Sequence, residues 1–363
     1  MKYVDEFRDK KLVRRISDQI KEMIPSGRIN IMEVCGTHTQ NFCRFALDQL
    51  LPENLKLISG PGCPVCVSSQ EYVDQAVAYA RRKDIIVLTF ADMLRVPGRE
   101  SSLEQERAKG AKVFAVYSPT DALKFAQDNP GKKIIFLGVG FETTAPAIAL
   151  SAIAAKKNKL KNIFFFNSFK LIPPAIKELM KDKRLNLSGF LCPGHVSAII
   201  GTRPYDFIPD KYRIGCCVAG FEPLDILEGL YLLVKQLVNH KPAVDNQYVR
   251  VVSRQGNIAA QKILRQVFRV YDANWRGLGK IPGSGLKFGA GFSAFDAQAV
   301  FPVKLTALPQ ESKKKCRCAE ILKGLIRPSA CSLFSQECSP EKPVGPCMVS
   351  YEGACNAYYR YKR

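Results

Sequence analysis

The stretch KIIFLGVGFETTAPAIALSAIAA, residues 133–155, decides the fold of this chain. Its first part, Lys133–Val139, is a short apolar run that predicts a buried strand, and Thr144–Ala155 predicts the helix that follows. A buried strand that leads directly into a helix is the repeating unit of a parallel α/β sheet. The stretch therefore predicts an α/β fold, and the same alternation recurs on both sides of it.

Strand and helix patterns alternate from residue 29 to residue 218. Further strands are predicted at Ile29–Val34, Leu55–Ser59, Ile85–Phe90, Val113–Tyr117, Asn162–Phe166, Gly189–Leu191 and Arg213–Val218. The helices predicted between them are Thr39–Leu51, Ser69–Arg82, Leu103–Lys109, Pro174–Lys181 and Ser197–Ile200. The turn Asp128-Asn-Pro-Gly131 separates two sets of these units. We therefore expect two similar parallel-sheet α/β domains, at residues 31–125 and 126–234.

The two ends of the chain have a different pattern. The first thirty residues predict an amphipathic helix, and Leu224–Val238 predicts a long one. Beyond it we expect a short strand at Val249–Val252 and a helix at Ile258–Phe268, then the glycine-rich stretch Gly277–Gly291 and a cysteine-rich tail. These features predict a third, α+β domain built from residues 1–30 and 235–363.

Composition limits the classes of function. Lys and Arg outnumber Asp and Glu by 54 to 33 over 363 residues, but the basic residues are spread along the chain and no basic stretch is interleaved with stacking aromatics. No run of 18 apolar residues exists, and the N-terminus lacks the apolar core of a secretory signal. We expect a cytoplasmic protein with neither nucleic acid nor membrane as a partner. The net charge of +21 instead favours acidic partner proteins.

Four unusual motifs each follow a predicted strand. They are Cys35-Gly-Thr-His38, Gly60-Pro-Gly-Cys-Pro-Val-Cys66, Gly138-Val-Gly-Phe-Glu-Thr-Thr-Ala145 and Cys192-Pro-Gly-His195. Ligands of open α/β sheets bind beyond the carboxyl ends of the strands. We therefore expect the four motifs to line one cleft between the two α/β domains.

Cys35 and His38 are the first candidate pair. A thiolate and an imidazole three residues apart could act as nucleophile and base, or as two ligands of a soft metal such as iron. The alternative is a small buried cysteine beside a capping threonine. The chain has only three histidines, and two of them, His38 and His195, lie in these motifs. That distribution favours a functional role.

Cys63 and Cys66 form a Cys-x-x-Cys pair near a predicted helix start. Such a pair can cycle between dithiol and disulfide, and a helix N-terminus lowers a thiol pKa. Half of a zinc site is the alternative, with Cys35 and His38 as the plausible other half.

Glu142, with Thr143 and Thr144, lies in the third motif. The third glycine of a dinucleotide-binding fingerprint is missing there, so a nucleotide site is not expected. These side chains could hydrogen-bond a polar ligand, or they could cap the helix that follows.

Six of the 13 cysteines lie in the tail: Cys316, Cys318, Cys331, Cys338, Cys347 and Cys355. A 4Fe–4S cluster takes four thiolates, which leaves two for a redox pair. Zinc sites prefer two tight Cys-x2-4-Cys knuckles, which the tail lacks. The spacing favours a cluster and leaves open which four cysteines bind it.

Longer motifs extend the pattern over nearly the whole chain. They are Met32-Glu-Val-Cys-Gly-Thr-His-Thr39, Gly60-Pro-Gly-Cys-Pro-Val-Cys-Val67, Phe90-Ala-Asp-Met-Leu-Arg-Val-Pro-Gly98, Val139-Gly-Phe-Glu-Thr-Thr-Ala-Pro146, Cys192-Pro-Gly-His-Val-Ser197, Ala219-Gly-Phe-Glu-Pro-Leu-Asp225, Trp275-Arg-Gly-Leu-Gly279 and Gly345-Pro-Cys-Met-Val-Ser-Tyr-Glu-Gly-Ala-Cys355. In these motifs the chain resembles the hydrogenase maturation factor HypD family.

The resemblance implies a role in building the Fe(CN)2CO unit of nickel–iron hydrogenases. Members of that family work with a small chaperone, HypC, and receive cyanide from HypE, which carries it as a thiocyanate after HypF supplies the carbamoyl group. The implied fold is two α/β domains and a third that carries a 4Fe–4S cluster.

Carried over residue by residue, the resemblance implies that Cys35 binds the iron under assembly with His38 beside it, and that Cys63 and Cys66 are the redox pair. The implied cluster ligands are Cys316, Cys331, Cys338 and Cys355, with Cys318 and Cys347 as an accessory pair, in an arrangement like that of ferredoxin–thioredoxin reductase. Departures from the family pattern are Phe169 in place of a common histidine, Cys216 and Cys217 in a stretch that is often Pro-Val, and Cys43 in place of an aromatic or aliphatic residue. The rival function is a stand-alone iron–sulfur thiol–disulfide oxidoreductase.

Overall fold

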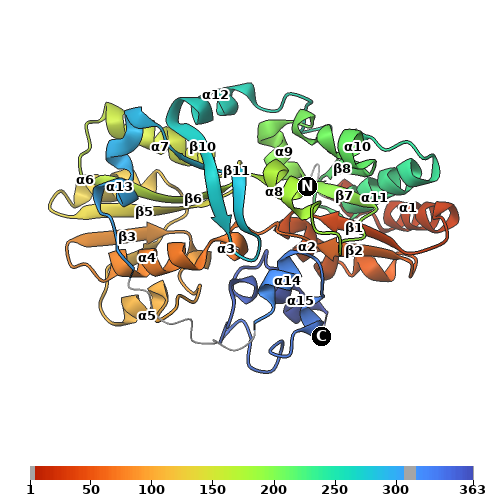
Figure 1. Cartoon of the computed structure of the whole chain (residues 1–363), viewed down its shortest axis with the longest axis horizontal. Helices are drawn as coiled ribbons and strands as arrows, with labels where there is room; N and C mark the ends of the chain where they lie inside the picture. The colour runs from red at the N-terminus through yellow and green to blue at the C-terminus, as the bar shows by residue number, and fades with distance from the viewer. Residues whose placement is uncertain (1–4, 306–315, 363) are drawn as a thin grey trace.

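The computed structural model describes residues 5–305 and 316–362 and contains two β-sheets, each with its own helices. Figure 1 shows the two α/β halves side by side, with the blue C-terminal segment below and between them. We call residues 316–362 the C-terminal segment. Hydrogen bonds join it to both halves, from Thr37 to Glu352 and from Ser350 to Asp92.

The first sheet is fully parallel and has the order β2-β1-β7-β8-β9. Its strands are β1 (Ile29–Glu33), β2 (Leu55–Ser59), β7 (Gly189–Pro193), β8 (Gly215–Ala219) and β9 (Val244–Asn246). Strands β1, β7 and β8 are buried along their whole length, as expected for parallel strands covered on both faces.

The second sheet has the order β10-β11-β6-β5-β3-β4. Its strands are β3 (Ile85–Thr89), β4 (Val113–Ala115), β5 (Lys133–Gly140), β6 (Ile163–Lys170), β10 (Phe268–Trp275) and β11 (Gly279–Phe288). Strands β3 to β6 are parallel, and the antiparallel hairpin β10–β11 extends the sheet beside β6.

The helices divide between the two halves and the C-terminal segment. Those of the first half are α1 (Lys10–Met23), α2 (Gly36–Arg44), α9 (Gly194–Ile200), α10 (Phe207–Tyr212) and α11 (Pro223–Val238). The others before the C-terminal segment are α3 (Pro64–Val67), α4 (Gln70–Ala80), α5 (Leu103–Ala108), α6 (Asp121–Asp128), α7 (Ala145–Lys157), α8 (Ile172–Leu179), α12 (Ile258–Val267) and α13 (Ala297–Val300). The C-terminal segment contains α14 (Cys318–Leu322) and α15 (Ala354–Tyr361).

One apolar core runs from the second sheet through the junction of the halves into the C-terminal segment. It joins Val139 and Tyr72 to Phe190 and Val218 of the first sheet, and to Met348 of the C-terminal segment. Two further cores lie under α7 and under α11. The C-terminal segment therefore packs against both halves through one shared core.

The domain boundaries expected from the sequence do not follow the sheets. The boundary at 125/126 falls inside the second sheet, which takes β3 and β4 from before it and β5 and β6 from after it. The first sheet is completed by pairing of β1 with β7, with Ile31 opposite Gly189. The pairing of strands so far apart in the sequence cannot be recognised from local residue patterns. Two interleaved halves therefore give the same sequence pattern as two consecutive domains.

The composition of the expected third domain also needs correction. Helix α1 packs on α11 of the first half instead of joining the tail, and β9 and the β10–β11 hairpin belong to the two sheets. Residues 1–4, 306–315 and 363 of that expected domain lie outside the described residues.

Most elements predicted from the sequence are present with small shifts at their ends. The α/β class and two halves that contain parallel sheets are confirmed. The strand expected at Val249–Val252 was wrong, and the glycine-rich stretch contains β11. The helix expected at Thr39–Leu51 ends at Arg44, because Ala46 has a left-handed backbone with φ of 49°. No helix among residues 5–305 and 316–362 is both long enough and apolar enough to cross a membrane.

Candidate thiol site between the sheets

The loops of Cys35 and Cys63 follow neighbouring strands and lie in direct contact. Gly36 N–H donates a hydrogen bond to the Gly62 carbonyl (2.8 Å), and a Cβ atom on Gly62 would lie 2.3 Å from the nitrogen of Cys35. Only glycine at position 62 allows this approach. The structure therefore brings the first two sequence motifs together beyond the carboxyl ends of β1 and β2.

Cys35 stands at the N-cap of α2 and is buried. Backbone N–H groups of His38 and Thr37 favour its thiolate, as expected at a helix N-terminus. Burial, reinforced by the charge of Glu352, outweighs them and raises the pKa of Cys35 to about 12. The thiol is therefore protonated at neutral pH when nothing is bound to it.

Glu33, the last residue of β1, lies in the motif Met32–Thr39 and is hydrogen-bonded to the Cys35 loop. Its carboxyl accepts hydrogen bonds from Cys35 N–H (2.8 Å) and from the Thr39 hydroxyl. Burial raises the pKa of Glu33 to about 8. A role for Glu33 was not predicted from the sequence, although a carboxyl at the end of a buried strand is itself a signal.

His38 lies beside the loop but bonds away from Cys35. Its Nε2 donates to the Gly220 carbonyl (2.8 Å) at the end of β8, which leaves Nδ1 unprotonated, buried and without a hydrogen-bond partner. Burial lowers the pKa of His38 to about 4. The ring is neutral at pH 7 and presents a free acceptor.

His195 and His38 pack against one aromatic ring. Phe221 stacks on exposed His195 with ring centroids 3.9 Å apart, and its centroid lies 5.0 Å from that of His38. Both histidines therefore lie next to Phe221, which follows β8 of the first sheet. Partial burial lowers the pKa of His195.

Cys63 is the N-cap of α3, the one-turn helix after β2, and Cys66 lies within this helix. Cys66 N–H donates to Cys63 Sγ (3.2 Å), and both side chains are buried. Burial raises the pKa of Cys66 well above the usual value, and contacts with the thiols of Cys347 and then Cys63 raise it further. Cys66 therefore touches its motif partner on one side and the C-terminal segment on the other.

Thiol contacts continue from Cys66 into the C-terminal segment. Cys347 interacts with Cys318, Cys355 and Cys66, and Cys318 interacts in turn with Cys316. We call the series Cys63, Cys66, Cys347, Cys318 and Cys316 the thiol chain. It joins the second motif to the tail without a gap in its side-chain contacts.

All six tail cysteines line one small pocket of the C-terminal segment. Its other lining residues include Ile321, Leu333, Phe334 and Met348. The contact with Cys318, followed by burial, raises the pKa of Cys316, and burial raises that of Cys338. For Cys318 the contact with Cys316 lowers the pKa, but Cys347 and burial raise it to about 12 overall.

This donor set fits an iron–sulfur cluster. A cluster needs several thiols that converge in a dry pocket, and the six cysteines with their apolar neighbours meet that requirement. Among the described residues, no group of three or more Cys, His, Asp or Glu side chains is arranged to hold a single metal ion.

Glu142, expected in the same cleft, lies in the second half of the molecule. Its Oε1 accepts a hydrogen bond from Ile172 N–H (3.0 Å), whereas its Oε2 is buried without a partner. Burial raises the pKa of Glu142 to about 8. Gly138 of the same motif lies within β5, where a Cβ would collide with the Asn167 side chain at 2.1 Å. The hydrogen bond of Glu142 is made to Ile172, whereas β5, which leads into its motif, contacts α3.

Two acidic residues at the junction were not predicted from the sequence. Glu352 accepts a hydrogen bond from the Thr37 hydroxyl (2.9 Å), and Asp92 accepts one from Ser350 (2.6 Å). Asp92 lies in the motif Phe90–Gly98 and Glu352 in the motif Gly345–Cys355. Both motifs were identified from the sequence, but the contacts of these two carboxylates depend on the tertiary structure.

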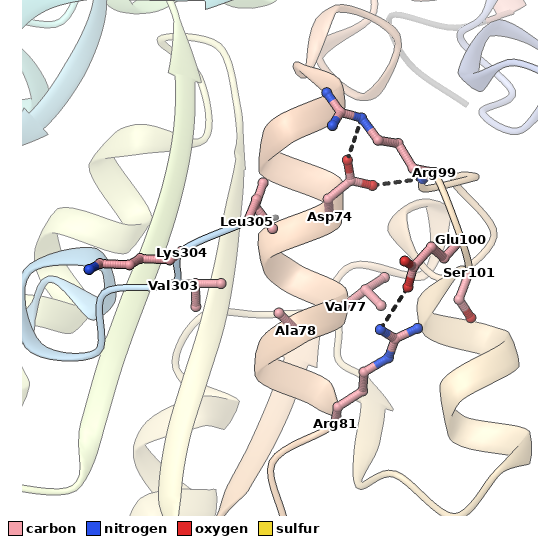
Figure 2. Close-up of a pocket in the computed structure, with 10 residues that line it drawn as sticks. All are labelled: Asp74, Val77, Ala78, Arg81, Arg99, Glu100, Ser101, Val303, Lys304 and Leu305. Atoms are coloured by element: carbon pink, nitrogen blue, oxygen red, sulfur yellow. Dashed lines mark hydrogen bonds and ion pairs between the residues drawn. The ribbon is translucent and has the colours of Figure 1, made fainter. Parts of the chain in front are cut away.

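A separate cavity of about 190 Å³ lies between α4 and residues 99–101 and 303–305 (Figure 2). Four of its five charged lining residues form two ion pairs, Asp74 with Arg99 (3.3 Å) and Arg81 with Glu100 (3.0 Å), and Lys304 is the fifth. Among the described residues, neither cysteine nor histidine lines it. The cavity therefore offers none of the chemistry found at the thiol site.

Comparison with known proteins places the whole chain among related sequences. A family model named HypD, described as "Hydrogenase formation hypA family", matches residues 10–362. The chain is 42% identical to "Hydrogenase maturation factor HypD" of Escherichia coli (strain K12), with 100% of this chain and 99% of that protein aligned. It is 41% identical to "Hydrogenase maturation factor HypD2" of Bradyrhizobium diazoefficiens, with 100% and 97% aligned.

Proposed function

Because the chain belongs to the HypD family of hydrogenase maturation factors, we propose that it is the scaffold and redox protein on which the Fe(CN)2CO unit of a nickel–iron hydrogenase is assembled. The single observation that supports this proposal most is the thiol chain, which leads from the loop against Cys35 to the six-cysteine pocket.

Cys35 binds the iron cargo in this proposal, shared with a cysteine of a HypC-type chaperone. A soft thiolate suits low-spin iron that carries cyanide and carbon monoxide. The pKa of about 12 means that binding of the iron must displace the thiol proton. The backbone N–H groups of His38 and Thr37 then stabilise the thiolate that forms.

His38 is the residue suited to accept a hydrogen bond from a polar ligand beside the cargo. Its Nε2–H is committed to Gly220, so only Nδ1 is free to accept. A pKa of about 4 keeps the ring neutral, and a neutral ring neither repels the iron cation nor competes for the thiolate.

Cys63 and Cys66 supply the two electrons needed to release cyanide. The donor is the thiocyanate that HypE carries on a cysteine, written R–S–CN. The two thiols are oxidised to a disulfide while the S–CN bond breaks, which gives R–SH and HCN. Two protons and two electrons leave the dithiol and both arrive on the products, so the step balances.

Cys316, Cys331, Cys338 and Cys355 would hold the 4Fe–4S cluster, and Cys318 and Cys347 remain as the accessory pair. When bound, such a cluster supplies single electrons at low potential. The contacts of Cys347 with both Cys66 and Cys318 support the accessory assignment, because they place the pair between the second motif and the other tail cysteines.

The charge of the chain supports docking to acidic partners. A net charge of +21 attracts more acidic proteins by long-range electrostatics, and HypC-type and HypE partners in the cytoplasm are the proposed ones. Association with such partners should weaken as salt concentration rises.

A stand-alone thiol–disulfide oxidoreductase is the rival function. Cys63 is 3% exposed and Cys66 is fully buried, so both functions require an opening of the structure before a substrate reaches these sulfur atoms. The contact of Cys66 with Cys347 favours the proposed function, because it connects the dithiol to the tail pocket inside the protein.

Anaerobic purification together with the chaperone tests the proposal. Iron, acid-labile sulfide and infrared spectra should show a cluster together with cyanide and carbonyl stretching bands on the complex. Efficient turnover of a small dithiol by the chain alone would instead support the rival function, and zinc without sulfide would contradict the cluster.

A further inference from the structure

The C-terminal segment reaches the Cys35 loop through Glu352. The Thr37 hydroxyl donates to Glu352 Oε1 (2.9 Å), and Thr37 lies in the first turn of α2, next to the amides that face the Cys35 thiol. The side chain of Glu352 is mostly buried. A hydrogen bond to a carboxylate in such a place fixes both partners more firmly than an exposed one.

The backbone of the same residue closes over Gly36. A Cβ atom on Gly36 would lie 2.4 Å from Glu352 Cβ and 2.5 Å from its carbonyl oxygen. No other residue type fits at position 36 while Glu352 stays in place. The contact is therefore a close fit of two chain segments, and Cys35 is the residue immediately before it.

The turn that carries Glu352 is internally fixed and also carries Cys347. Gly353 N–H donates to the Ser350 carbonyl (2.9 Å), and a Cβ on Gly353 would lie 2.2 Å from the Cys347 carbonyl oxygen. Ser350 is anchored to Asp92 (2.6 Å). One rigid turn thus places Cys347 against Cys66 and Glu352 against the Cys35 loop.

We propose that Glu352 is a positioning residue for Cys35. As long as the C-terminal segment is docked, Glu352 covers the Cys35 thiol and fixes the first turn of α2. Undocking of this turn uncovers Cys35 and at the same time separates Cys347 from Cys66. Access to the iron-binding thiol and its connection to the tail pocket therefore change together. This inference rests on the proposed role of Cys35 in cargo binding.

Accessibility of Cys35 in the apo protein tests the inference independently of maturation. The full-length, fully reduced protein is treated with iodoacetamide, and alkylation of the Cys35 peptide is followed by mass spectrometry. Glu352→Ala should increase the rate at Cys35 about tenfold or more, because a buried charge-assisted hydrogen bond no longer opposes local opening. Gly36→Ala should also increase the alkylation rate at Cys35, because it disrupts the same contact from the other residue. The double variant of Gly36→Ala and Glu352→Ala should have a rate close to that of either single variant.

Two controls separate positioning from a general loss of structure. Glu320→Gln removes a carboxylate of the same segment that pairs with Arg317 and not with the Cys35 loop, and it should leave the rate unchanged. Glu352→Gln keeps an oxygen for Thr37 and should largely restore protection. Unfolding temperature and the alkylation rate of buried Cys217 should stay the same in all variants that support the inference.

A second readout uses the loaded complex with the chaperone. Cyanide and carbonyl bands present in the wild type should shift or broaden in Glu352→Ala while iron and sulfide content is retained. Equal alkylation rates at Cys35 in Glu352→Ala, Gly36→Ala and wild type would overturn the inference even if the wild-type bands are present. Absence of bands in the wild type would instead overturn the proposed function, and the alkylation rates would still decide the role of Glu352.

Discussion

The thiol of Cys66 lies against the thiol of Cys347, although the two residues come from opposite ends of the chain. The contact also includes the Pro346 carbonyl, 3.8 Å from Cys66 Sγ. At this contact the C-terminal segment meets the second motif. The contact supports the division of the six tail cysteines into cluster ligands and an accessory pair.

Replacement of Cys347 should interrupt the thiol chain but spare the cluster. In Cys347→Ser, iron and sulfide content should match the wild type, because the accessory pair is not among the proposed ligands. Reduction of the Cys63–Cys66 disulfide by dithionite should slow strongly, which is measured by thiol trapping and mass spectrometry. Cys217→Ser is the matched control, because Cys217 is equally buried but lies outside the thiol chain. Loss of iron and sulfide in Cys347→Ser would show that Cys347 is a ligand instead.

Single replacements across the tail should sort the six cysteines into two groups. Serine at position 316, 331, 338 or 355 should remove most of the iron and sulfide, since a cluster with three thiolates is less firmly held. Serine at position 318 should have little effect on either content. Analysis of iron and acid-labile sulfide per chain, with the visible absorbance of the cluster, checks this prediction. If replacement of a different set of four cysteines removes the iron and sulfide, the cluster still lies in this pocket, but the accessory pair is not Cys318 and Cys347.

Gly62→Ala should separate the first two motifs. The new Cβ would lie 2.3 Å from the Cys35 nitrogen, so one of the two loops must move. Overpacking of this kind costs roughly 1–3 kcal/mol of stability. Hydrogenase maturation should be lost while cluster content is kept, as measured by hydrogenase activity and by iron analysis. Gly131→Ala is a suitable control for an added methyl group, because Gly131 has nothing within 4 Å of its Cβ position and its φ is not positive. Normal maturation in Gly62→Ala would contradict the proposed proximity.

Glu142 should make the apo protein less stable as pH rises. Its folded-state pKa of about 8 exceeds the ordinary value of 4.5, so between these two values the folded protein holds a proton that the unfolded chain has lost. The free energy of unfolding then falls with rising pH, by up to about 1.4 kcal/mol per pH unit for this one group. Glu142→Gln should reduce the slope between pH 5 and pH 8, and Glu33, whose pKa is also about 8, should supply the slope that remains. Denaturant unfolding at several pH values measures it, and parallel profiles for the two proteins would show that Glu142 is ionised in the fold.

The local elements of this protein could be predicted from sequence because buried parallel strands are short apolar runs. Lys133–Val139 and Ile85–Phe90 each became a strand within one residue of the expected ends. The assignment of strands to sheets could not be predicted, because the pairing of Ile31 with Gly189 depends on a connection that passes through the other half of the molecule. Strand β11 was missed since its glycines mask the alternation of a strand.

The candidate site could be predicted by residue type but not by arrangement. Rare residues such as His38 and the clustered cysteines stand out in any sequence of this composition. The orientation of His38 toward Gly220, and the contact of Glu352 with Thr37, depend on backbone positions set by β8 and by the C-terminal segment. Glu142 follows a strand as the other motifs do, yet it lies in the other half of the molecule, so the shared edge expected for all four motifs extends across two sheets.

The infrared spectrum of the chaperone complex carrying Cys35→Ala tests the central claim most directly. Cys43→Ala is the matched control, because Cys43 is also a buried cysteine of α2 but faces Lys362 and Asp48 instead of the Cys63 loop. We predict that cyanide and carbonyl bands disappear in Cys35→Ala, with the cluster still present, and persist in Cys43→Ala. Unchanged bands in Cys35→Ala would contradict the assignment of the iron cargo to this thiol.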